Sequence, residues 1–341
     1  MRALVFDPEG GLRVTEVPTP QPGPGEVLVR VEACGICGSD RQLVRGEGAP
    51  LGTSYPVVLG HEIAGRVAAL GEGVSGLAPG DAVVVHPFVP CGQCAACARR
   101  EEHLCPHQEV IGFTRPGGDA EYVAVPAQNA IPRPDGLDPA EAAILVDAYA
   151  TPYRAMVSAG VAEEEAVLVI GTGGLGLAAV QIAKALGVPQ VAVLSRREDA
   201  GALALVSGAD EFVTFAGDPR QAARKLRRMA KGGIGLVLDT SGFADGIAFA
   251  LDVLRPGGKL VTVAMPLDEI PVPFAKLARK GVALQGSFGS RREDVEALLR
   301  MAQEGRVQPD VVAGRRVSLE EAPDAVKNPF FGRDVVVFGT P

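Results

Sequence analysis

The spacing of apolar positions divides the chain near residue 163. Before that point, short apolar runs at residues 27–31, 65–70 and 82–85 are separated by turns containing glycine and proline, which is typical of β-structure. Beyond it, uniformly apolar runs of four or five residues alternate with helical stretches, beginning with a strand at 166–170 and a helix at 175–186. Strands that are apolar along their whole length indicate a parallel sheet with both faces covered.

The same alternation continues to about residue 263, and a shorter mixed segment follows it. The remaining elements expected are strands at 191–194, 236–239, 259–263 and 334–338, and helices ending near 206 and spanning about 244–253 and 292–304. The chain is therefore expected to be α/β, with a β-rich region followed by a doubly wound parallel sheet.

Composition narrows the class of protein. The 341 residues suggest two domains, and a hydrophobic fraction of 47% is ordinary for a globular chain. A formal net charge of −8 without a basic run argues against a nucleic-acid partner. No apolar run reaches about 18 residues, which argues against a membrane span. Arg2 and Pro8 interrupt the start too early for a signal peptide, so we expect a cytoplasmic protein.

A glycine-rich loop follows the first strand of the second region. Residues 171–176 read Gly-Thr-Gly-Gly-Leu-Gly, directly after a strand and at the start of a helix. In a dinucleotide-binding loop, the first glycine allows the tight turn, the second lets the backbone approach a pyrophosphate, and the third permits close helix packing. A purely structural turn is the alternative. The residues assigned to cofactor binding are Gly171, Gly173, Gly174, Leu175 and Gly176.

The end of the second strand bears on the choice of cofactor. NAD-binding folds place an acid there to bond the ribose 2′-hydroxyl, but Ser195, Arg196 and Arg197 follow the strand at 191–194. A hydroxyl and two guanidinium groups suit a 2′-phosphate, so we expect NADP(H) to be preferred over NAD(H). The alternative is that the two arginines are solvated and that Glu198 or Asp199 bonds the ribose.

Four of the six cysteines form a compact group. Cys91, Cys94, Cys97 and Cys105 lie within fifteen residues. In a large chain without a secretion signal, this spacing indicates metal binding rather than disulfides, and four thiolates close a tetrahedron around a structural zinc ion. An iron–sulfur cluster is the alternative, but the position of the fourth cysteine does not match the ferredoxin spacing.

Two further candidates for zinc ligands lie apart in the sequence. Cys37 offers a thiolate and His61 an imidazole, and both have acidic neighbours. Taken alone, such a histidine is more often structural, and Cys34 with Cys37 has the spacing of a redox pair. The four-cysteine group and the glycine loop in the same chain favour the metal interpretation.

These motifs, in this order, resemble those of the zinc-containing medium-chain alcohol dehydrogenases. The resemblance covers nearly the whole length and rests on Cys37-Gly38-Ser39-Asp40, Gly60-His61-Glu62 with Gly65, the four-cysteine group and the glycine loop. It implies a GroES-like catalytic domain over residues 1–151, which includes the zinc lobe at about 90–106 and is completed by 289–341. It also implies a Rossmann cofactor-binding domain over 152–288.

The resemblance further implies a catalytic zinc with three protein ligands and one open position. Cys37 and His61 match the first two ligands. Asp147 stands where the third is expected, four residues before Thr151, and an aspartate ligand resembles the secondary-alcohol branch of the family. A helix-cap aspartate is the alternative. Glu62 resembles the acid that can approach zinc when water leaves.

Other site residues are assigned by the same resemblance. Ser39 resembles the hydroxyl that first takes the proton of the alcohol, Thr151 the residue beside the nicotinamide, and Arg333 a residue that holds the cofactor pyrophosphate in some relatives. A surface ion pair is the alternative for Arg333. Gln42 stands where many relatives have a histidine and cannot titrate, so the terminal proton acceptor is left unassigned. His86 either borders the pocket or is buried for structural reasons.

The sequence therefore predicts a zinc- and NADP(H)-dependent dehydrogenase acting on a small alcohol, ketone or aldehyde. A polyol or sugar dehydrogenase of the same family, linked to NAD, is the first alternative, since Arg41, Gln42 and Glu47 could make a polar pocket. A zinc-free reductase and a nicotinamide sensor without chemistry are weaker alternatives. The resemblance also implies a homo-oligomer, either a dimer or a tetramer.

Overall fold

The computed structural model describes residues 1–47, 52–164, 166–215, 218–266 and 268–339. They form two compact units. Unit 1 contains Met1–Ala150, Gly289–Glu304 and Ala313–Pro341, and unit 2 contains Thr151–Phe288 and Gly305–Val312. No helix among the described residues is long and apolar enough to cross a membrane.

Unit 2 is built on a six-stranded parallel sheet with strand order β13-β12-β11-β14-β15-β16. The chain starts in the middle of the sheet with β11, moves outward through β12 and β13, and returns to the other side of β11 with β14, which is the doubly wound pattern. The strands are β11 (Ala166–Ile170), β12 (Gln190–Ser195), β13 (Glu211–Thr214), β14 (Ile234–Asp239), β15 (Leu254–Thr262) and β16 (Ala283–Gly286). The expected Rossmann architecture is confirmed.

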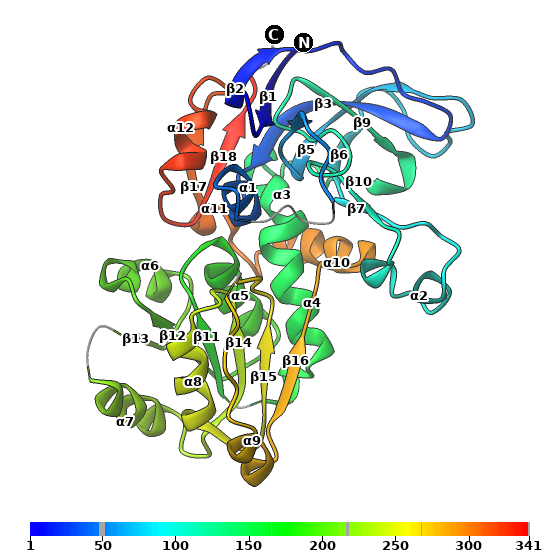
Figure 1. Ribbon diagram of the computed structural model, residues 1–341. Coiled ribbons are helices and arrows are strands. Elements are labelled where there is room, and N and C mark those ends of the chain that lie inside the picture. The colour runs from blue at the N-terminus through cyan, green and yellow to red at the C-terminus, as the bar shows by residue number, and fades with distance from the viewer. Residues whose placement is uncertain (48–51, 165, 216–217, 267, 340–341) are drawn as a thin grey trace. The chain divides into compact units, whose positions relative to one another are not determined.

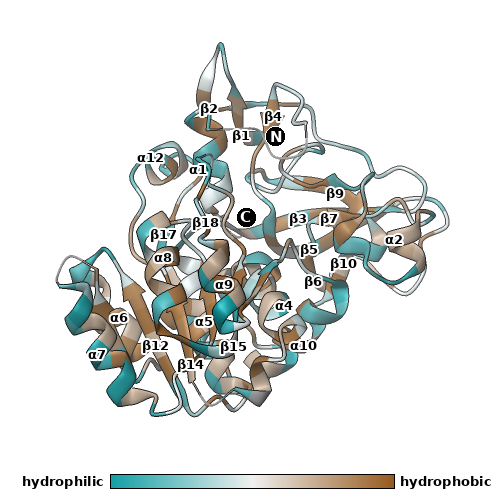
Figure 2. Cartoon of the chain, turned by 60° about the horizontal axis from the view of Figure 1, so that its bottom comes forward, coloured by the Kyte–Doolittle hydropathy of each residue, from teal (hydrophilic) through white to brown (hydrophobic). Residues whose placement is uncertain are grey.

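Apolar sequence explains why these strands lie in the centre of unit 2. Every residue of β11 and of β14 is buried, and Figure 2 shows the central strands mainly in the hydrophobic colour. The helices of this unit are α4 (Ala150–Ser158, whose first residue belongs to unit 1), α5 (Gly174–Ala185), α6 (Gly201–Val206), α7 (Pro219–Met229), α8 (Ala244–Val253), α9 (Phe274–Lys280) and α11 (Pro309–Val312). Ligands of such sheets bind at the carboxyl ends of the strands, where the chain order reverses between β11 and β14.

The short segment Gly305–Val312 belongs to unit 2, whereas the expected boundaries place it with the first domain. A reciprocal pair of hydrogen bonds joins this segment to α5. The side chain of Gln181 on α5 accepts from the backbone N–H of Gln308 at 2.7 Å and donates to its carbonyl oxygen at 3.0 Å. Both partners lie within unit 2.

Unit 1 is β-rich and contains a seven-stranded sheet with the order β10-β6-β5-β3-β18-β17, to which β9 adds on β3. The C-terminal strand β18 pairs antiparallel with β3, so residues about 300 positions apart lie side by side in this sheet. Its strands are β3 (Glu26–Gly35), β5 (Glu62–Leu70), β6 (Ala82–Val85), β9 (Tyr122–Pro126), β10 (Ala130–Pro132), β17 (Ala313–Val317) and β18 (Arg333–Val337).

Smaller elements complete unit 1. Two further sheets contain β1 (Arg2–Asp7), β2 (Gly11–Glu16) and β4 (Val57–Val58), and β7 (Phe88–Val89) with β8 (Glu109–Val110). The helices are α1 (Gly38–Val44), α2 (Ala95–Ala98), α3 (Pro139–Ile144), the π-helix η3 (Leu145–Tyr149), α10 (Arg292–Gln303) and α12 (Ala322–Lys327). The 3-10 helices are Glu102–Leu104 and Ala127–Asn129 here, and Val161–Glu163 and Glu198–Ala200 in unit 2.

Candidate active site and metal centres

Cys37 is held at the start of α1 by its own neighbours. It is buried and precedes the first helical residue, and its backbone N–H donates to the carboxylate of Asp40 at 2.8 Å. An acid at the third helical position that reaches back to the N-cap backbone is a capping arrangement. The spacing from Cys37 to Asp40 therefore fixes the backbone that carries the Cys37 thiol.

His61 is placed by a glycine that no larger residue could replace. Gly60 has a φ of +94°, and a Cβ there would come within 2.6 Å of the Asp119 backbone nitrogen and of the Cys34 sulfur. The imidazole is 5% exposed, and its two nitrogens face different carboxylates. Nδ1 lies 3.4 Å from Asp40 Oδ1, and Nε2 lies 3.7 Å from Asp147 Oδ2.

Asp147 comes to the same point from the π-helix η3. The residue lies inside this helix, whose N-cap is Ile144, so the helix-cap interpretation of Asp147 is wrong. Single π-helical turns occur often at functional sites. Its Oδ2 atom is 3.4 Å from the sulfur of Cys37.

The three donors have the spacing that zinc requires. The sulfur of Cys37, a ring nitrogen of His61 and a carboxylate oxygen of Asp147 all lie within 4.8 Å of one another. Usual zinc–ligand bond lengths in a tetrahedron put a sulfur and an oxygen ligand about 3.6 Å apart, and a nitrogen and an oxygen ligand about 3.4 Å apart. The observed separations, 3.4 Å for sulfur to oxygen and 3.7 Å for nitrogen to oxygen, lie within about 0.3 Å of these values. Three protein ligands leave a fourth position open for a substrate or water.

Glu62 and Arg333 form a buried ion pair beside this group. Arg333 begins β18, is 3% exposed, and places its Nη2 atom 3.2 Å from Glu62 Oε1 and 3.6 Å from Asp147 Oδ2. The interpretation of Arg333 as part of a surface ion pair is therefore wrong, because its partners are buried. Its proposed contact with a cofactor stays a prediction.

Opposing charges set the protonation of the buried groups. Burial alone would raise the pKa of the Cys37 thiol, but Arg333 and His61 outweigh burial and lower that pKa. Burial alone would lower the pKa of His61, but Asp40 and Asp147 raise it well above its usual value. Burial raises the pKa of Glu62 well above its usual range, with Arg333 opposing the shift. A thiol with a lowered pKa is suited to metal binding, because the thiolate is the ligand.

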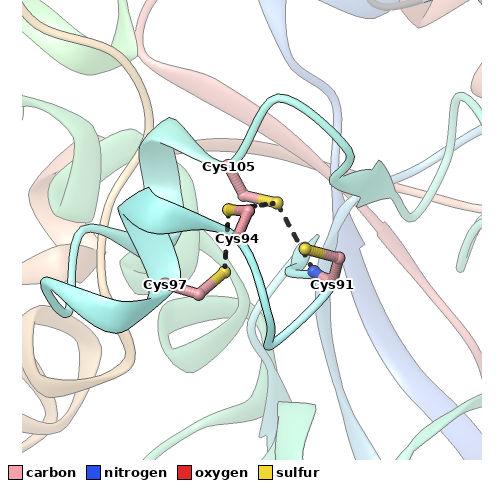
Figure 3. Close-up of side chains that lie close together, drawn as sticks. All are labelled: Cys91, Cys94, Cys97 and Cys105. Carbon is pink, nitrogen blue, oxygen red and sulfur yellow. Dashed lines mark hydrogen bonds between the residues drawn. The ribbon is translucent and has the colours of Figure 1, made fainter.

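The four-cysteine group forms a second candidate metal centre (Figure 3). The sulfur atoms of Cys91, Cys94, Cys97 and Cys105 lie within 4.8 Å of one another and are free of disulfide bonds. Cys94 Sγ is 3.5 Å from Cys97 Sγ and 3.8 Å from Cys105 Sγ. Four sulfurs around one zinc ion stand about 3.8 Å apart, so the arrangement fits a closed structural site. A hydrogen bond with the backbone of Cys97 is the main cause that lowers the pKa of Cys94, to about 7.

The glycine loop has the geometry that its sequence predicts. Gly171 has a φ of +111°, and a Cβ there would come 2.5 Å from Thr240 Oγ1. A Cβ at Gly176 would come 2.2 Å from the carbonyl oxygen of Gly171, whereas the space beside Gly173 is open. The loop therefore leaves backbone accessible at the N-terminus of α5, where an anion binds well.

A cavity of about 170 Å³ lies at the carboxyl ends of β11, β12 and β14. The hydroxyls of Thr172 and Ser195 are hydrogen-bonded at 2.9 Å on one side of it. Glu198 and Asp199 are exposed and do not line it, and Asp199 pairs with Arg197 at 3.4 Å. Its lining residues are Ile170, Gly171, Thr172, Gly173, Leu194, Ser195, Arg196, Arg197, Thr240, Ser241 and Phe243.

Comparison with known proteins decides the family. Residues 23–135 match the alcohol dehydrogenase GroES-like domain, and residues 174–304 match the zinc-binding dehydrogenase domain. An alcohol dehydrogenase of Geobacillus stearothermophilus is 34% identical over 321 residues, which cover 94% of this chain and 93% of the relative. This chain belongs to the zinc-containing medium-chain alcohol dehydrogenases. It is an oxidoreductase that acts on CH–OH groups, and the family uses zinc and a nicotinamide cofactor.

Other similar proteins are named for a particular substrate or described with a bound cofactor. The L-galactonate-5-dehydrogenase of Escherichia coli K12 is 33% identical over 322 residues, covering 93% of this dehydrogenase and 90% of the relative. A solved structure from Sinorhizobium meliloti 1021, described as a zinc-binding dehydrogenase bound to NADP, is 30% identical, covers 99% of both chains and has a TM-score of 0.90. The dehydrogenase is thus a zinc-dependent alcohol or polyol dehydrogenase.

The remaining expected residues of the dehydrogenase are placed as follows. Ser39 is half-buried on α1, two residues after Cys37, and Thr151 is 8% exposed on α4. His86 is buried, with Nε2 3.1 Å from the carbonyl oxygen of Ser290, which favours its structural interpretation. Cys34 is fully buried, and burial together with Asp119 raises its pKa well above normal, which does not suit a redox pair.

Two residues were given no role by the sequence, although Asp40 was named as part of the motif that begins at Cys37. Asp40 faces the Nδ1 atom of His61, and an acid three residues after a helix N-cap is the signal that could have indicated it. Phe243 lines the cavity at the carboxyl ends of β11, β12 and β14 from the loop after β14. No local motif marks it, because most of the other lining residues, at 170–173 and 194–197, lie about 50 to 70 residues earlier in the chain.

Proposed function

We propose that the dehydrogenase oxidises a small secondary alcohol, or reduces the matching ketone or an aldehyde, with NADP(H) as its preferred cofactor. The cavity lining supports this cofactor. Among the described residues that line it are two arginines and four hydroxyl side chains, and none is a carboxylate. Guanidinium and hydroxyl groups donate to a 2′-phosphate, whereas an acid that bonds the ribose of NAD would repel it.

The proposed catalytic residues are those that meet around the open metal position. Zinc held by Cys37, His61 and Asp147 would act as a Lewis acid toward the alcohol oxygen, and the nicotinamide would accept the hydride. Asp40 lies behind His61 and orients it, as carboxylates commonly do for histidine ligands. Arg333 faces the carboxyl groups of Glu62 and Asp147 at 3.2 and 3.6 Å, and its charge opposes the effect of burial on the pKa of Glu62.

Ser39 is the proposed first acceptor of the proton of the alcohol. A serine hydroxyl can accept and donate a proton in one relay step but does not store it at neutral pH. Gln42, one turn further along α1, has no titratable group. The relay therefore ends in water or at another base. Thr151 is proposed to lie beside the nicotinamide, and the residues 171–176 with Ser195, Arg196 and Arg197 are proposed to hold the dinucleotide.

The preference for a secondary alcohol rests on Asp147 as third ligand. Arg41, one of the residues considered for a polar polyol pocket, instead pairs with the buried carboxylate of Asp334 at 3.4 Å. That contact removes one of the three side chains considered for that pocket. The similarity to an L-galactonate-5-dehydrogenase keeps a polyol substrate as the second candidate.

Initial-rate kinetics with NADP⁺ and NAD⁺ test the proposal. The substrate panel contains primary alcohols, secondary alcohols, polyols and threonine. We expect the highest kcat/KM with NADP⁺ and a secondary alcohol. Ser195→Asp places a carboxylate at the tip of β12 and should shift the preference toward NAD⁺. A higher kcat/KM for NAD⁺ in the unaltered enzyme contradicts the cofactor assignment, and a polyol optimum favours the second candidate.

We also propose that the dehydrogenase is a homo-oligomer. β16 is the last strand on its side of the parallel sheet, and Leu284 on it is 48% exposed. Exposed apolar edge strands promote association with another strand. Light scattering of Leu284→Lys against the unaltered chain tests this, with a smaller assembly expected; an unchanged mass rules out this edge as the interface.

A further inference from the structure

Arg196 makes a cation–π contact with an aromatic ring at the proposed nucleotide site. Its guanidinium carbon lies 4.6 Å from the centroid of the Phe243 ring, and both residues line the cavity at the carboxyl ends of the strands. A guanidinium within about 6 Å of a ring face is attracted to it. Arg196 itself is exposed, so an ordering contact of this kind determines where its long side chain lies.

The ring of Phe243 packs against Phe215, which in turn packs against a third phenylalanine. Phe215, which follows β13, meets Phe243 edge to face at 4.9 Å and 89°. Phe215 also meets Phe249 of α8 at 6.0 Å and 86°. Phe249 is 7% exposed and belongs to the apolar core of unit 2. The contacts therefore run from the core through three rings to Arg196; we call Phe249, Phe215 and Phe243 the aromatic column.

The backbone under Phe243 is also held in place. Asp239, fully buried at the end of β14, accepts hydrogen bonds from the backbone N–H groups of Ser241 and Gly242 at 3.0 and 3.1 Å. The ring of Phe243 packs where α8 has Gly246, since a Cβ at that position would come 2.8 Å from Cδ1 of the ring. Backbone and side-chain contacts thus restrict this ring to one position.

A cation–π contact leaves an arginine able to bind a phosphate. A guanidinium that lies over a ring can still donate through the N–H groups at its edge. The neighbouring Arg197 is instead paired with Asp199 at 3.4 Å. Holding Arg196 in advance lowers the side-chain entropy that binding would otherwise cost. We propose that Phe243 is a positioning residue for cofactor choice, which acts by holding Arg196 where it meets the 2′-phosphate of NADP(H).

This inference rests on the proposed NADP(H) preference. Calorimetric measurement of the affinity for two nucleotides tests the inference and that preference separately. Adenosine 2′,5′-bisphosphate and 5′-AMP differ only by the 2′-phosphate. The unaltered enzyme should bind the bisphosphate more tightly, and Arg196→Ala should remove most of that difference. Phe243→Leu should weaken the bisphosphate roughly three- to tenfold, as expected for loss of a cation–π contact, and change the affinity for 5′-AMP much less.

Two further variants separate positioning from simple structural support. Phe243→Tyr keeps the ring face and should retain the affinity for the bisphosphate. The double variant Arg196→Ala with Phe243→Leu should bind the bisphosphate almost as tightly as Arg196→Ala alone. The reason is that Phe243 acts on this affinity through Arg196. The inference is overturned if Phe243→Leu weakens both nucleotides equally, which would indicate contact with adenine, or weakens neither. If the unaltered enzyme does not distinguish the nucleotides, the proposed cofactor preference fails as well.

Discussion

Asp40 and His61 form a buried pair in which Oδ1 of the carboxylate lies 3.4 Å from Nδ1 of the imidazole. The other ring nitrogen, Nε2, faces Asp147. The pair therefore presents Nε2 toward the candidate metal position. A carboxylate on the far nitrogen of a histidine ligand fixes its tautomer and its orientation, which makes Asp40 part of the metal centre without being a ligand.

Replacing Asp40 should weaken zinc binding at this centre. Asp40→Asn keeps the size of the side chain but removes the charge that faces His61, so we expect the zinc affinity to fall roughly 10- to 100-fold. Competition with a chromophoric chelator measures it. Asp294→Asn is the matched control, because Asp294 makes the same capping contact at 2.8 Å with the N–H of Arg291 on α10. Equal zinc affinity in Asp40→Asn and the control would contradict this role.

The four-cysteine group should hold its zinc independently of the catalytic centre. Cys97→Ser removes one of four sulfur ligands, so we expect the zinc content to fall from about two to about one ion per chain. The melting temperature should fall with it, since structural zinc contributes folding energy. Cys34→Ala is the control, because Cys34 belongs to neither group of metal-binding residues. A zinc content of two in Cys97→Ser would show that the group is not a zinc site.

His86 should make the dehydrogenase sensitive to acid. Burial lowers the pKa of His86 to about 4, whereas an unfolded histidine titrates near 6.5. Its contribution to stability is therefore complete above about pH 6.5 and is lost as the pH falls toward 4, up to about 3 kcal/mol in total. Urea unfolding of His86→Gln should show a shallower loss over this interval than the unaltered chain. His107 is exposed, so His107→Gln should lose stability with falling pH as steeply as the unaltered chain. An equal loss in all three proteins would show that His86 does not cause the acid sensitivity.

Asp119 should lower the stability of the folded chain as the pH rises, whereas His86 lowers it as the pH falls. Burial, with Asp40 as the second cause, raises the pKa of Asp119 to about 8, so the folded state holds a proton that the unfolded state releases near pH 4. The contribution of this group is present below pH 4 and is lost as the pH rises toward 8. Asp119→Asn should therefore be more stable than the unaltered chain at pH 8, by more than about 1 kcal/mol. Urea unfolding at pH 5 and pH 8 checks this; a stability difference that does not grow with pH would count against it.

Local sequence was sufficient for some features of the fold and of the site. The strand Ala166–Ile170 is predictable because it is apolar throughout, and the expected strand at 236–239 is predictable from the apolar residues 236–238; the structure buries every residue of Ala166–Ile170 and of Ile234–Asp239. The four-cysteine group is predictable because its members lie within fifteen residues, so a single loop brings them together. In such cases the spacing along the sequence is enough to predict that the side chains lie close together.

Contacts between distant segments were not predictable in the same way. Arg333 meets Glu62 and Asp147 because β18 pairs with β3, and no local pattern reports a pairing across about 300 residues. Asp147 was placed by resemblance, and only the π-helix shows how it points at Cys37. Phe215 and Phe249 lie in different elements from Phe243, so the aromatic column has no signature in the sequence.

The central claim is that Cys37, His61 and Asp147 together hold the catalytic zinc. Elemental analysis of Asp147→Asn, made alongside its rate of alcohol oxidation, tests it most directly. We predict a loss of about one zinc ion per chain and of nearly all activity, with the four-cysteine site still filled. An unchanged zinc content together with unchanged activity would remove Asp147 from the site and contradict the account.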